Sequence, residues 1–490
     1  MNIKTSDGRS FTFSYRQLTS HILSLAKIIS PSIKQGDRVV LYKLNNSDWI
    51  ISYFAVVSVG GIAVTVDSRA NNAYVQDVIE LTKPKFIFTT VAAEDIPNTS
   101  NVKIAEISKL DLEKQVDFVL PDLNEDNPCE IIFTSGTWAK PKGVTLSQKN
   151  IFTNLNENSQ RFSVTPKDRF LSIIPVTHIY EQMAGLLVPL YFGASIFYHP
   201  LESKKDFNNA LKFARPTKLV VVPLVAELIY NSYGKTLGWA FAPIQSGLLL
   251  SRRVPTLIRR ALWYPLRLSL GGSLNQMVIG GAPMTIELDH FFQGLGVEVF
   301  IGYGLSETSP VISISKNQKR KPGEVGKPYD SYEYSQNHTG ELLVRGPSVF
   351  KGYWPDISNS DETWYNTGDI VIFDQQGRLI IKGRSKNMFV YPSGDKIFAE
   401  DIEALMNEYL DCETCCVNIG VGLDNDLKVV TTRPDINLKE CKAYLASKLP
   451  GFVQINDILY YGESELPRTF SKKINRRVVQ DWVEILYARN

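Results

Sequence analysis

Short apolar runs alternate with longer stretches of helical length through the first 325 residues of the chain. The runs at 38–44, 61–67 and 85–90 have the length and the β-branched content of strands, and the stretches at 48–60 and 73–82 between them have the length of helices. The segments FLSIIP, GASIFY, KLVVVP, QMVIGG and VEVFIGYG continue the pattern. Because strands that are apolar on both faces belong to sheets covered by helices on both sides, this region is predicted to form mostly parallel α/β layers.

The pattern changes after about residue 325. The segments GELLVRG and IVIFDQQGRLIIKG, with turn residues between their apolar runs, are typical of antiparallel hairpins. Beyond Arg384 the chain has the pattern of a compact α+β unit with its own apolar residues. Its helices are expected near 399–410, near 438–449 and after Ile474, and its strands near 415–421 and 427–432.

The predicted fold class is therefore α/β. Residues 1–383 are expected to form a large N-terminal domain of layered, mostly parallel α/β subdomains plus a β-rich section. Residues 384–490 are expected to form a small, mobile α+β C-terminal domain. A length of 490 residues agrees with more than one domain, because a single hydrophobic core usually stops growing below that size.

Composition narrows the class of protein. The 53 basic and 51 acidic residues give a net charge of +2, which provides no global field to hold nucleic acid. Five cysteines do not make a disulfide framework and indicate reduced thiols. A zinc site at Cys412, Cys415 and Cys416 is an alternative, but no second Cys/His pair follows at the required spacing, so a helix end entering a buried strand is preferred. The polar N-terminus and the lack of an apolar run of about 18 residues predict a cytoplasmic location.

The strongest local motif is the sequence IIFTSGTWAKPKG at 131–143. A buried strand leads into a loop rich in hydroxyl groups and glycine, with two lysines. Such a loop offers backbone N–H groups, hydroxyls and an ammonium to polyphosphate oxygens, although its spacing is not that of a Walker A loop. An ordinary exposed turn has the same composition. The candidate phosphate ligands are Thr134, Ser135, Gly136, Thr137 and Lys142.

This loop resembles the T-S-G-T-T-G-x-P-K-G motif of the adenylate-forming superfamily, which includes acyl-CoA synthetases, luciferases and peptide-synthetase adenylation domains. All but two positions of the motif fit, and Trp138 and Ala139 are the departures. The resemblance extends over nearly the whole chain, because four further blocks follow in the family's order. It implies that ATP and Mg²⁺ bind here and that Thr134 is among the catalytic residues.

Two of these blocks are implied to surround the adenine and the α-phosphate. In GGAP at 280–283, Gly281 and Ala282 would form a wall of the adenine pocket, where small residues let the flat base approach. In GYGLSET at 302–308, Gly302 and Tyr303 would lie along the adenine.

The second half of that block would contact phosphate and metal. By resemblance Ser306, which replaces a threonine, touches the α-phosphate, and Glu307 is the magnesium ligand and a catalytic residue. A carboxylate suits Mg²⁺, which prefers hard oxygen ligands and keeps several waters. Outside this context Glu307 would be interpreted as a solvated loop carboxylate.

The ribose is implied to lie against two later blocks. Asp369, in the T-G-D block, would accept hydrogen bonds from both ribose hydroxyls, for which its two oxygens are suited. Arg384, in the G-R-S-K block, would also contact the ribose, and Lys386 takes the family's hinge position between the domains.

The last block, LPRTFSKKINR at 466–476, aligns Lys473 with the family's catalytic lysine. A lysine there would neutralise charge shared between the substrate carboxylate and the α-phosphate during attack. Lys472 replaces the family's glycine, so a solvated basic turn is the alternative.

The acid and the acceptor are indicated by weaker motifs. The sequence PVTHIYEQ at 175–182 resembles a block of long-chain acyl-CoA synthetases in which the histidine, here His178, lies near the reacting carboxylate. A histidine after a strand is more often a structural hydrogen-bonding residue. Gly394 aligns with the loop that leads pantetheine to the adenylate. Fatty acyl-AMP ligases carry an extra insertion, and none is evident between Gly326 and Gly340. Coenzyme A is therefore favoured as the acceptor, and an acyl carrier protein is the alternative.

The predicted function is therefore ATP-dependent activation of a carboxylic acid, with a long-chain fatty acid favoured, followed by thioester formation with coenzyme A. A non-catalytic relative that binds nucleotide or acyl-adenylate is the rival, motivated by Trp138, Ala139 and Lys472. The basic and apolar stretch 251–267 is predicted either to rest on an anionic membrane or to be a solvated helix with basic pairs.

Overall fold

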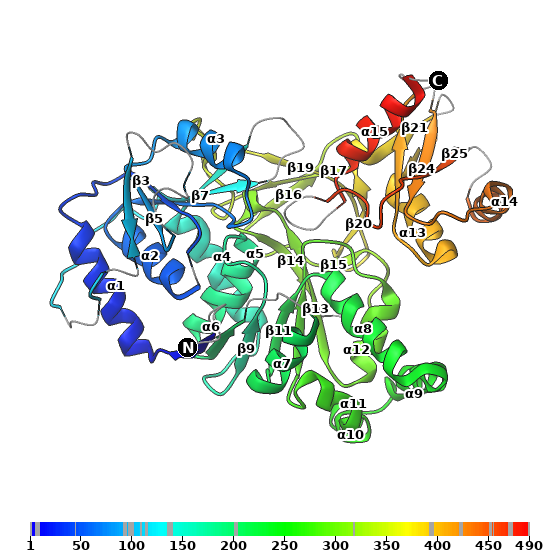
Figure 1. Ribbon diagram of the computed structural model, residues 1–490, viewed down its shortest axis with the longest axis horizontal. Coiled ribbons are helices and arrows are strands. Elements are labelled where there is room, and N and C mark those ends of the chain that lie inside the picture. The colour runs from blue at the N-terminus through cyan, green and yellow to red at the C-terminus, as the bar shows by residue number, and fades with distance from the viewer. Residues whose placement is uncertain are drawn as a thin grey trace.

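The computed structural model of the protein describes most of the chain. It forms a mixed α/β fold with two large, mostly parallel sheets, which confirms the predicted fold class (Figure 1). No helix in the described ranges is both long and apolar enough to cross a membrane. The described residues are 2–4, 10–44, 46–91, 96, 102–107, 110–112, 116–134, 141–199, 204–316, 319–391, 396–420, 425–449, 453, 455–468 and 474–488.

The first large sheet has seven strands in the order β18-β8-β7-β4-β3-β5-β6. Strands from β7 to β6 are parallel, whereas β8 and β18 run antiparallel to their neighbours. Val39, Val40 and Leu41 on β3 are all buried, as expected for a strand covered on both faces. The strands are β3 (Arg38–Leu41), β4 (Ile62–Thr65), β5 (Phe86–Thr89), β6 (Lys103–Glu106), β7 (Pro128–Thr134), β8 (Lys142–Ser147) and β18 (Gly352–Trp354), and the helices of this region are α1 (Tyr15–Ile29), α2 (Asn46–Ser58), α3 (Asn72–Thr82) and α4 (Gln148–Arg161).

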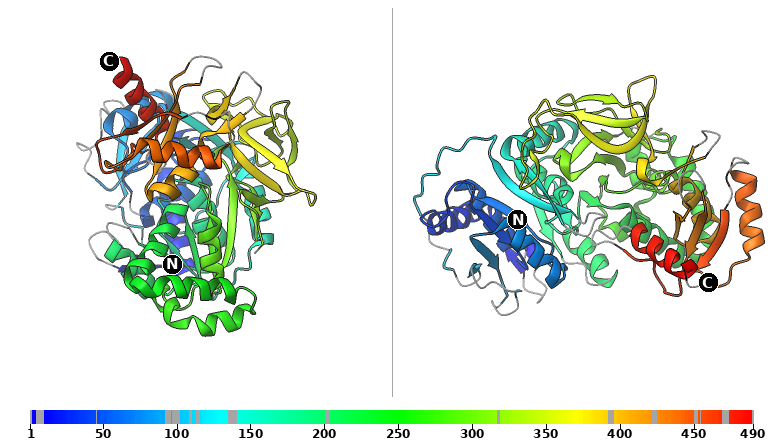
Figure 2. Two further views of the ribbon diagram at one scale, coloured as in Figure 1. Left: turned by 90° about the vertical axis from the view of Figure 1, so that its right-hand side faces the viewer. Right: turned by 90° about the horizontal axis from the view of Figure 1, so that it is seen from above.

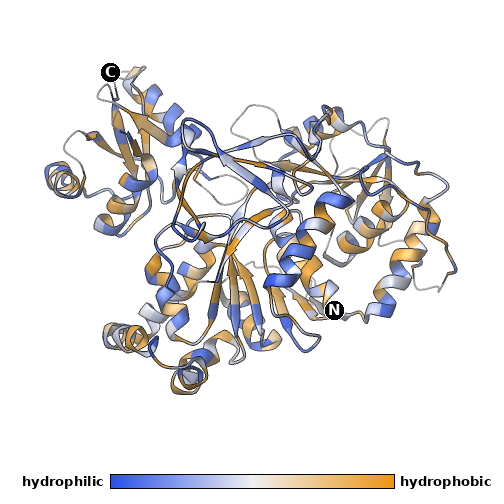
Figure 3. Cartoon of the chain, turned by 180° about the vertical axis from the view of Figure 1, so that it is seen from behind, coloured by the Kyte–Doolittle hydropathy of each residue, from blue (hydrophilic) through white to orange (hydrophobic). Residues whose placement is uncertain are grey.

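The second large sheet has eight strands in the order β14-β13-β12-β11-β9-β10-β1-β2, with antiparallel pairs only at its two edges. Its strands are mostly hydrophobic (Figure 3). The strands are β1 (Asn2–Lys4), β2 (Ser10–Thr12), β9 (Arg169–Ser172), β10 (Ser195–Tyr198), β11 (Lys218–Val221), β12 (Gln276–Ile279), β13 (Glu298–Gly304) and β14 (Val311–Ser315).

The helices of this region cover the sheet and extend beyond it. They include a short π-helical segment, η3, directly after α5. They are α5 (Ile179–Glu181), η3 (Gln182–Leu187), α6 (Val188–Tyr191), α7 (Lys204–Ala214), α8 (Pro223–Leu237), α9 (Phe241–Ser251), α10 (Thr256–Leu262), α11 (Tyr264–Arg267) and α12 (Ile286–Gly294), with 3₁₀ turns η4 (Gly238–Ala240), η5 (Leu268–Leu270) and η6 (Ser306–Thr308).

A five-stranded antiparallel sheet follows, as the hairpin pattern predicted, in the order β15-β20-β19-β17-β16. In the right-hand view of Figure 2 its yellow strands lie between the blue N-terminal layers and the orange and red C-terminal elements. The strands are β15 (Glu324–Gly326), β16 (Glu333–Gln336), β17 (Glu341–Arg345), β19 (Tyr365–Phe373) and β20 (Leu379–Arg384).

The C-terminal elements form a two-stranded and a three-stranded sheet with their helices. The boundary predicted after residue 383 falls within β20, one residue before its end, and the division into two domains stays a prediction. The elements are η7 (Ser385–Asn387), β21 (Met388–Val390), β22 (Lys396–Phe398), α13 (Ala399–Leu410), β23 (Thr414–Asn418), β24 (Leu427–Thr431), α14 (Leu438–Lys448), β25 (Ile455–Tyr460) and α15 (Arg476–Ala488).

The cysteines near residue 415 belong to the packing of this C-terminal unit. Cys412 follows α13, and Cys415 and Cys416 are buried on β23, so the preferred interpretation from the sequence is confirmed. Burial raises the pKa of the Cys415 thiol to about 12, which keeps it protonated. Among the described residues no group of three or more Cys, His, Asp or Glu side chains is arranged to hold a metal ion.

Candidate active site

The candidate site lies at the carboxyl ends of the central strands of the eight-stranded sheet, where open α/β sheets bind ligands. Gly280 and Gly281 directly follow β12, and Gly302 lies near the end of β13. A Cβ atom on Gly280 would lie 3.1 Å from a ring carbon of Tyr180 and 3.3 Å from the carbonyl oxygen of Gly302. A Cβ atom there would require its neighbours to shift by a few tenths of an ångström, so the backbone is closely packed, as in a narrow pocket wall.

Tyr303, Asp369 and Arg384 meet although they come from different parts of the chain. The Tyr303 hydroxyl donates to Oδ2 of Asp369 over 2.6 Å, and the Arg384 Nε lies 2.7 Å from Oδ1 of Asp369. Arg384 also donates to the carbonyl of Thr367 over 3.1 Å. Burial and the Asp369 carboxylate raise the pKa of Tyr303 well above its usual value, so its proton stays on the phenol.

Glu307, Tyr353 and Lys142 form a second cluster. The Tyr353 hydroxyl donates to Oε1 of Glu307 over 2.7 Å, and the Lys142 ammonium lies over the Tyr353 ring, 5.2 Å from its centroid. The backbone of Thr134 is paired with Lys142 across the β7–β8 ladder. The two ends of the phosphate-loop motif therefore lie opposite each other. Ser135, Gly136 and Thr137 are outside the described residues.

Tyr365, at the start of β19, connects the two clusters. Its pKa is raised by burial and by the negative charge of Glu307, and the positive charge of Arg384 acts in the opposite direction. Its ring packs edge-on against Phe350, with centroids 5.2 Å apart. Tyr365 lies four positions before Asp369 on the same strand, and Tyr303 lies four positions before Glu307. The residues predicted for ribose and for magnesium are thus neighbours in space, and Ser306 lies in the η6 turn beside Glu307.

His178 faces a carboxylate that the sequence did not single out. Its Nε2 lies 3.7 Å from Oδ2 of Asp67, which follows β4. Burial raises the pKa of Asp67, but the hydrogen bonds and the positive charge of Arg69 outweigh this effect and hold the pKa below its usual value. Asp67 is therefore an anion beside His178, and the imidazole lies where strands of both large sheets end.

Two buried carboxyl groups, Glu181 and Glu130, belong to or are bonded by the segment that follows His178. The Ser172 hydroxyl donates to Glu181 over 2.5 Å, and burial raises the pKa of Glu181 to about 8. Glu130 accepts hydrogen bonds from Tyr53 and Gln182, and burial raises its pKa to about 7. The sequence analysis did not single out Glu181 or Gln182, although the E-Q pair at the end of the 175–182 motif is the feature that could have indicated these contacts.

Two further predicted site residues, like Ser135, Gly136 and Thr137, lie outside the described part of the chain. Gly394 falls between β21 and β22, which pair at Val390 and Lys396. Lys473 falls between Arg468 and Ile474, which form an isolated antiparallel bridge. The geometry of both side chains therefore stays a prediction.

The arginines of the stretch 251–267 mostly point inward, which differs from both interpretations of the sequence. Arg259 donates to the carbonyl of Gln293, Arg260 to that of Gly296, and Arg267 to that of Leu295. They bind carbonyls at the end of α12, so little of their charge is available to an anionic surface. Apart from Arg253, the exposed side chains of the stretch are apolar, among them Leu257, Ile258, Leu262 and Tyr264.

A largely apolar cavity of about 350 Å³ lies between α9 and α12. Leu249, Ile286 and Phe291 provide apolar lining, and Glu287 and His290 add polar groups. Because α12 begins just after the 280–283 block, this cavity is close along the chain to the predicted adenine wall.

A family model described as AMP-binding enzyme matches residues 3–354. The long-chain-fatty-acid–CoA ligase FadD15 of Mycobacterium tuberculosis is 29% identical over 416 residues, covering 76% of this chain and 69% of the relative. The peroxisomal long chain acyl-CoA synthetase 6 of Arabidopsis thaliana is 28% identical over 473 residues, covering 84% of this chain and 66% of the relative.

Solved structures share the fold at lower identity. ATP-bound MatB from Rhodopseudomonas palustris superposes with a TM-score of 0.80 at 19% identity, covering 99% of this chain and 96% of that one. The o-succinylbenzoate coenzyme A synthetase MenE of Bacillus subtilis, in complex with AMP, gives a TM-score of 0.77 at 19% identity, covering 97% and 94%.

Proposed function

The chain belongs to the family of AMP-binding enzymes, and from this membership we propose that it activates a long-chain fatty acid with ATP and transfers it to coenzyme A. One observation carries the proposal: the Tyr303–Asp369–Arg384 cluster and the Glu307–Tyr353–Lys142 cluster lie side by side at the carboxyl ends of the sheet. A ribose needs paired acceptors, and a triphosphate needs cations and a metal ligand. The adjacent clusters contain these groups.

In the first half-reaction a carboxylate oxygen of the acid attacks the α-phosphorus of ATP. The P–O bond to pyrophosphate breaks, and acyl-AMP forms. Lys142 and Lys473 would compensate negative charge on the phosphates and the attacking carboxylate. Glu307 would hold Mg²⁺, which supplies charge neutralisation at the phosphates, and a single hard carboxylate suits that ion.

In the second half-reaction the sulfur of coenzyme A attacks the acyl carbonyl carbon, the bond to AMP breaks, and a thioester results. We propose that residues 384–490 rotate about Lys386 between the two steps, so that the loop with Gly394 replaces the loop with Lys473. Domain rotation of this kind commonly limits turnover.

The chain length of the acid is the finer part of the proposal. Relatives named as long-chain-fatty-acid–CoA ligase and long chain acyl-CoA synthetase support it, as does the apolar cavity between α9 and α12. Each buried CH₂ group contributes about 0.8 kcal/mol, so an apolar cavity can select long chains without polar recognition. Solved structures of the same fold come from synthetases of other acids, so chain length must be measured.

The first experiment measures pyrophosphate release with Mg·ATP across fatty acids from C2 to C20, with and without coenzyme A. We expect release to be greatest with long chains and to turn over many times only with coenzyme A. If pyrophosphate release stopped after a single turnover with coenzyme A present, an acyl carrier protein would replace coenzyme A as the proposed acceptor. No release with any acid, despite ATP binding, would overturn the enzyme proposal and leave a nucleotide-binding relative.

Lys473→Ala tests which of the two lysines in the last motif, Lys472 or Lys473, is the catalytic one. It should abolish pyrophosphate release and keep ATP binding, because the lysine is proposed to act on the reacting groups. Lys472→Ala is the matched control, one residue away. If Lys472→Ala were the inactive variant, the catalytic lysine would have been assigned one position too late.

A further inference from the structure

Glu307, the proposed magnesium ligand, is held by a segment that lies more than 40 residues later in the chain. Besides the 2.7 Å hydrogen bond from Tyr353 to its carboxylate, its main-chain carbonyl accepts from the backbone N–H of Phe350 over 2.9 Å. The Ser309 hydroxyl, in the same turn, donates to the carbonyl of Ser348 over 2.9 Å. The turn and the carboxylate of Glu307 are thus both fixed by residues 348–353.

Strand pairing determines where Tyr353 lies. It is the central residue of β18, which joins the edge of the seven-stranded sheet by pairing antiparallel with β8, Tyr353 opposite Val144. Lys142 begins β8, so this pairing places its ammonium over the Tyr353 ring. One side chain therefore contacts both the cation proposed for the triphosphate and the carboxylate proposed for the metal.

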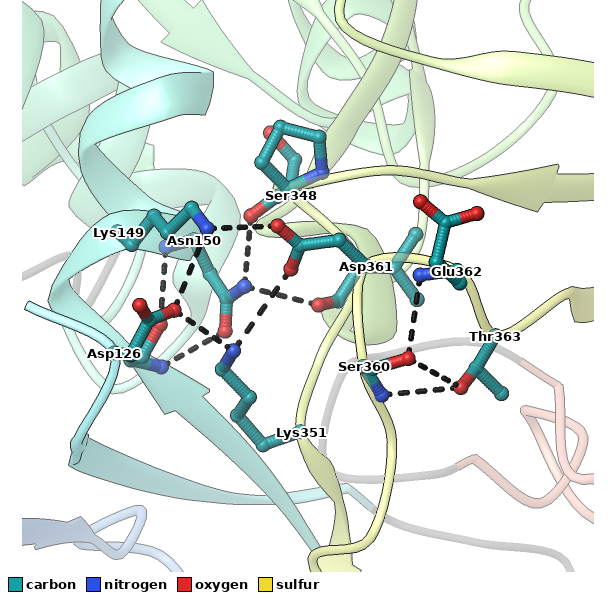
Figure 4. A network of polar contacts seen from close by, with 12 residues as sticks. Asp126, Lys149, Asn150, Ser348, Lys351, Ser360, Asp361, Glu362 and Thr363 are labelled. Atoms are coloured by element: carbon teal, nitrogen blue, oxygen red, sulfur yellow. Dashed lines mark hydrogen bonds and ion pairs between the residues drawn. The ribbon is translucent and has the colours of Figure 1, made fainter.

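An ion-pair network fixes the segment that carries Tyr353 (Figure 4). Lys351 lies 3.1 Å from Asp126 and 3.9 Å from Asp361, and Lys149 lies 2.7 Å from Asp361 and 3.5 Å from Asp126. Two lysines and two aspartates from three separate parts of the chain alternate in this network. Networks of several charges hold geometry better than isolated surface pairs do.

Resting on the proposed function, we propose that Tyr353 is a positioning residue of the Mg·ATP site. Its hydroxyl orients the Glu307 carboxylate through Oε1 and leaves Oε2 for the cation, and its ring holds the Lys142 ammonium next to that position. Hydrogen-bonding partners of metal-ligating carboxylates commonly affect metal affinity or activity by 10- to 100-fold. Tyr353 thus contacts both groups, whereas the neighbouring Tyr365 on β19 is influenced by Glu307 through its charge.

Tyr353→Phe tests the hydrogen bond alone, because it keeps the ring under Lys142. We measure ATP binding by calorimetry over a series of Mg²⁺ concentrations, without acid or coenzyme A. The Mg²⁺ concentration for half-maximal ATP binding should rise about 10-fold, while the melting temperature and ATP binding at saturating Mg²⁺ stay close to wild type. Tyr353→Leu also removes the ring and should weaken ATP binding even at saturating Mg²⁺.

Tyr334→Phe is the matched control. Tyr334 is exposed on β16 and stacks on Phe373 with ring centroids 5.2 Å apart, away from both clusters. ATP binding by Tyr334→Phe should depend on the Mg²⁺ concentration in the same way as ATP binding by the wild type. An unchanged magnesium dependence in Tyr353→Phe would overturn the inference. If instead the wild type binds Mg·ATP but releases no pyrophosphate with any acid, the proposed function fails while the calorimetric result for Tyr353 still decides the inference.

Discussion

Glu181 is a fully buried carboxyl group in a pocket that provides few partners. Ser172 is its one hydrogen-bond donor among the described contacts, and its second oxygen has none there. The carboxyl lies against Gly185 so closely that a Cβ atom on that glycine would lie 1.9 Å from Oε1. The neighbouring Tyr198 hydroxyl, also buried, provides no hydrogen bond. This environment favours the neutral acid, in agreement with the rise of its pKa to about 8.

The unfolding free energy should therefore depend on Glu181 over a defined pH window. Between the ordinary carboxyl pKa of 4.5 and the folded-state value of about 8, the folded protein keeps a proton that the unfolded chain has released. Stability consequently falls as pH rises through this window and levels off above it. Glu181→Gln should match the wild type near pH 5 and become more stable than it by up to a few kcal/mol near pH 8.

Urea unfolding at a series of pH values measures this difference. Glu80→Gln, on the exposed face of α3, is the control and should follow the wild type at every pH. A Glu181→Gln curve parallel to the wild-type curve would show that the folded protein holds Glu181 as a carboxylate.

Individual site residues could be predicted from the sequence where they belong to a motif that resembles a family motif and occurs in the family's order. Asp369, Tyr303 and Arg384 were named in this way, and the structure brings them together. Tyr353 was not named, because its contact with Glu307 depends on strand pairing between segments that no local pattern connects. Asp67 was missed for the same reason, since its neighbour His178 lies in the other large sheet's region.

At the scale of elements, the end of α12 depends on arginines from α10 and α11. Arg267 donates to the carbonyls of Leu295 and Leu274 over 2.8 and 2.5 Å, and its guanidinium is buried. Burial lowers the pKa of Arg267 to about 10. Arg267→Met keeps the apolar stem but leaves both carbonyls without this donor, which should reduce the unfolding free energy by about 2–4 kcal/mol.

Arg253→Met, in the same basic stretch, is the matched control. Arg253 is exposed, and its variant should lie within about 0.5 kcal/mol of the wild type in the same chemical unfolding experiment. Equal effects from both substitutions would show that the arginines act through total charge and not through the carbonyls of the α12 end.

Element positions followed from the sequence where a periodic pattern was long. The helix expected near 399–410 is α13 (Ala399–Leu410), and that expected near 438–449 is α14 (Leu438–Lys448). The sequence was less informative about which strands pair with each other. The strand β18 has only three residues and joins β8 from about 200 residues away, and neither its length nor its alternation distinguishes it from a turn.

At the scale of the whole molecule, charges of the C-terminal elements act on α8 of the preceding region. Glu227 on α8 is affected by the charges of Glu413 and Arg468, and its pKa is raised by burial and by Glu413. Arg468 forms an ion pair with Glu413 and pairs with Ile474 across the ends of the loop that contains Lys473. The base of this loop therefore lies within electrostatic range of α8, whose first residue follows β11 within two positions. We infer that this is the orientation proposed for the first half-reaction.

A contact made in only one orientation should affect only one half-reaction. Arg468→Ala removes the positive charge that acts on Glu227 of α8 from the C-terminal unit, so pyrophosphate release should slow by about 10-fold, which corresponds to about 1.4 kcal/mol. Thioester formation from supplied acyl-AMP and coenzyme A should keep its wild-type rate, because the C-terminal unit is then proposed to have rotated away. Arg477→Ala, which breaks an exposed pair with Asp481 on α15, controls for loss of charge and should change neither rate. Equal slowing of both half-reactions by Arg468→Ala would mean that Arg468 supports the fold of the C-terminal unit in either orientation, and the orientation observed would then carry no information about the reaction step.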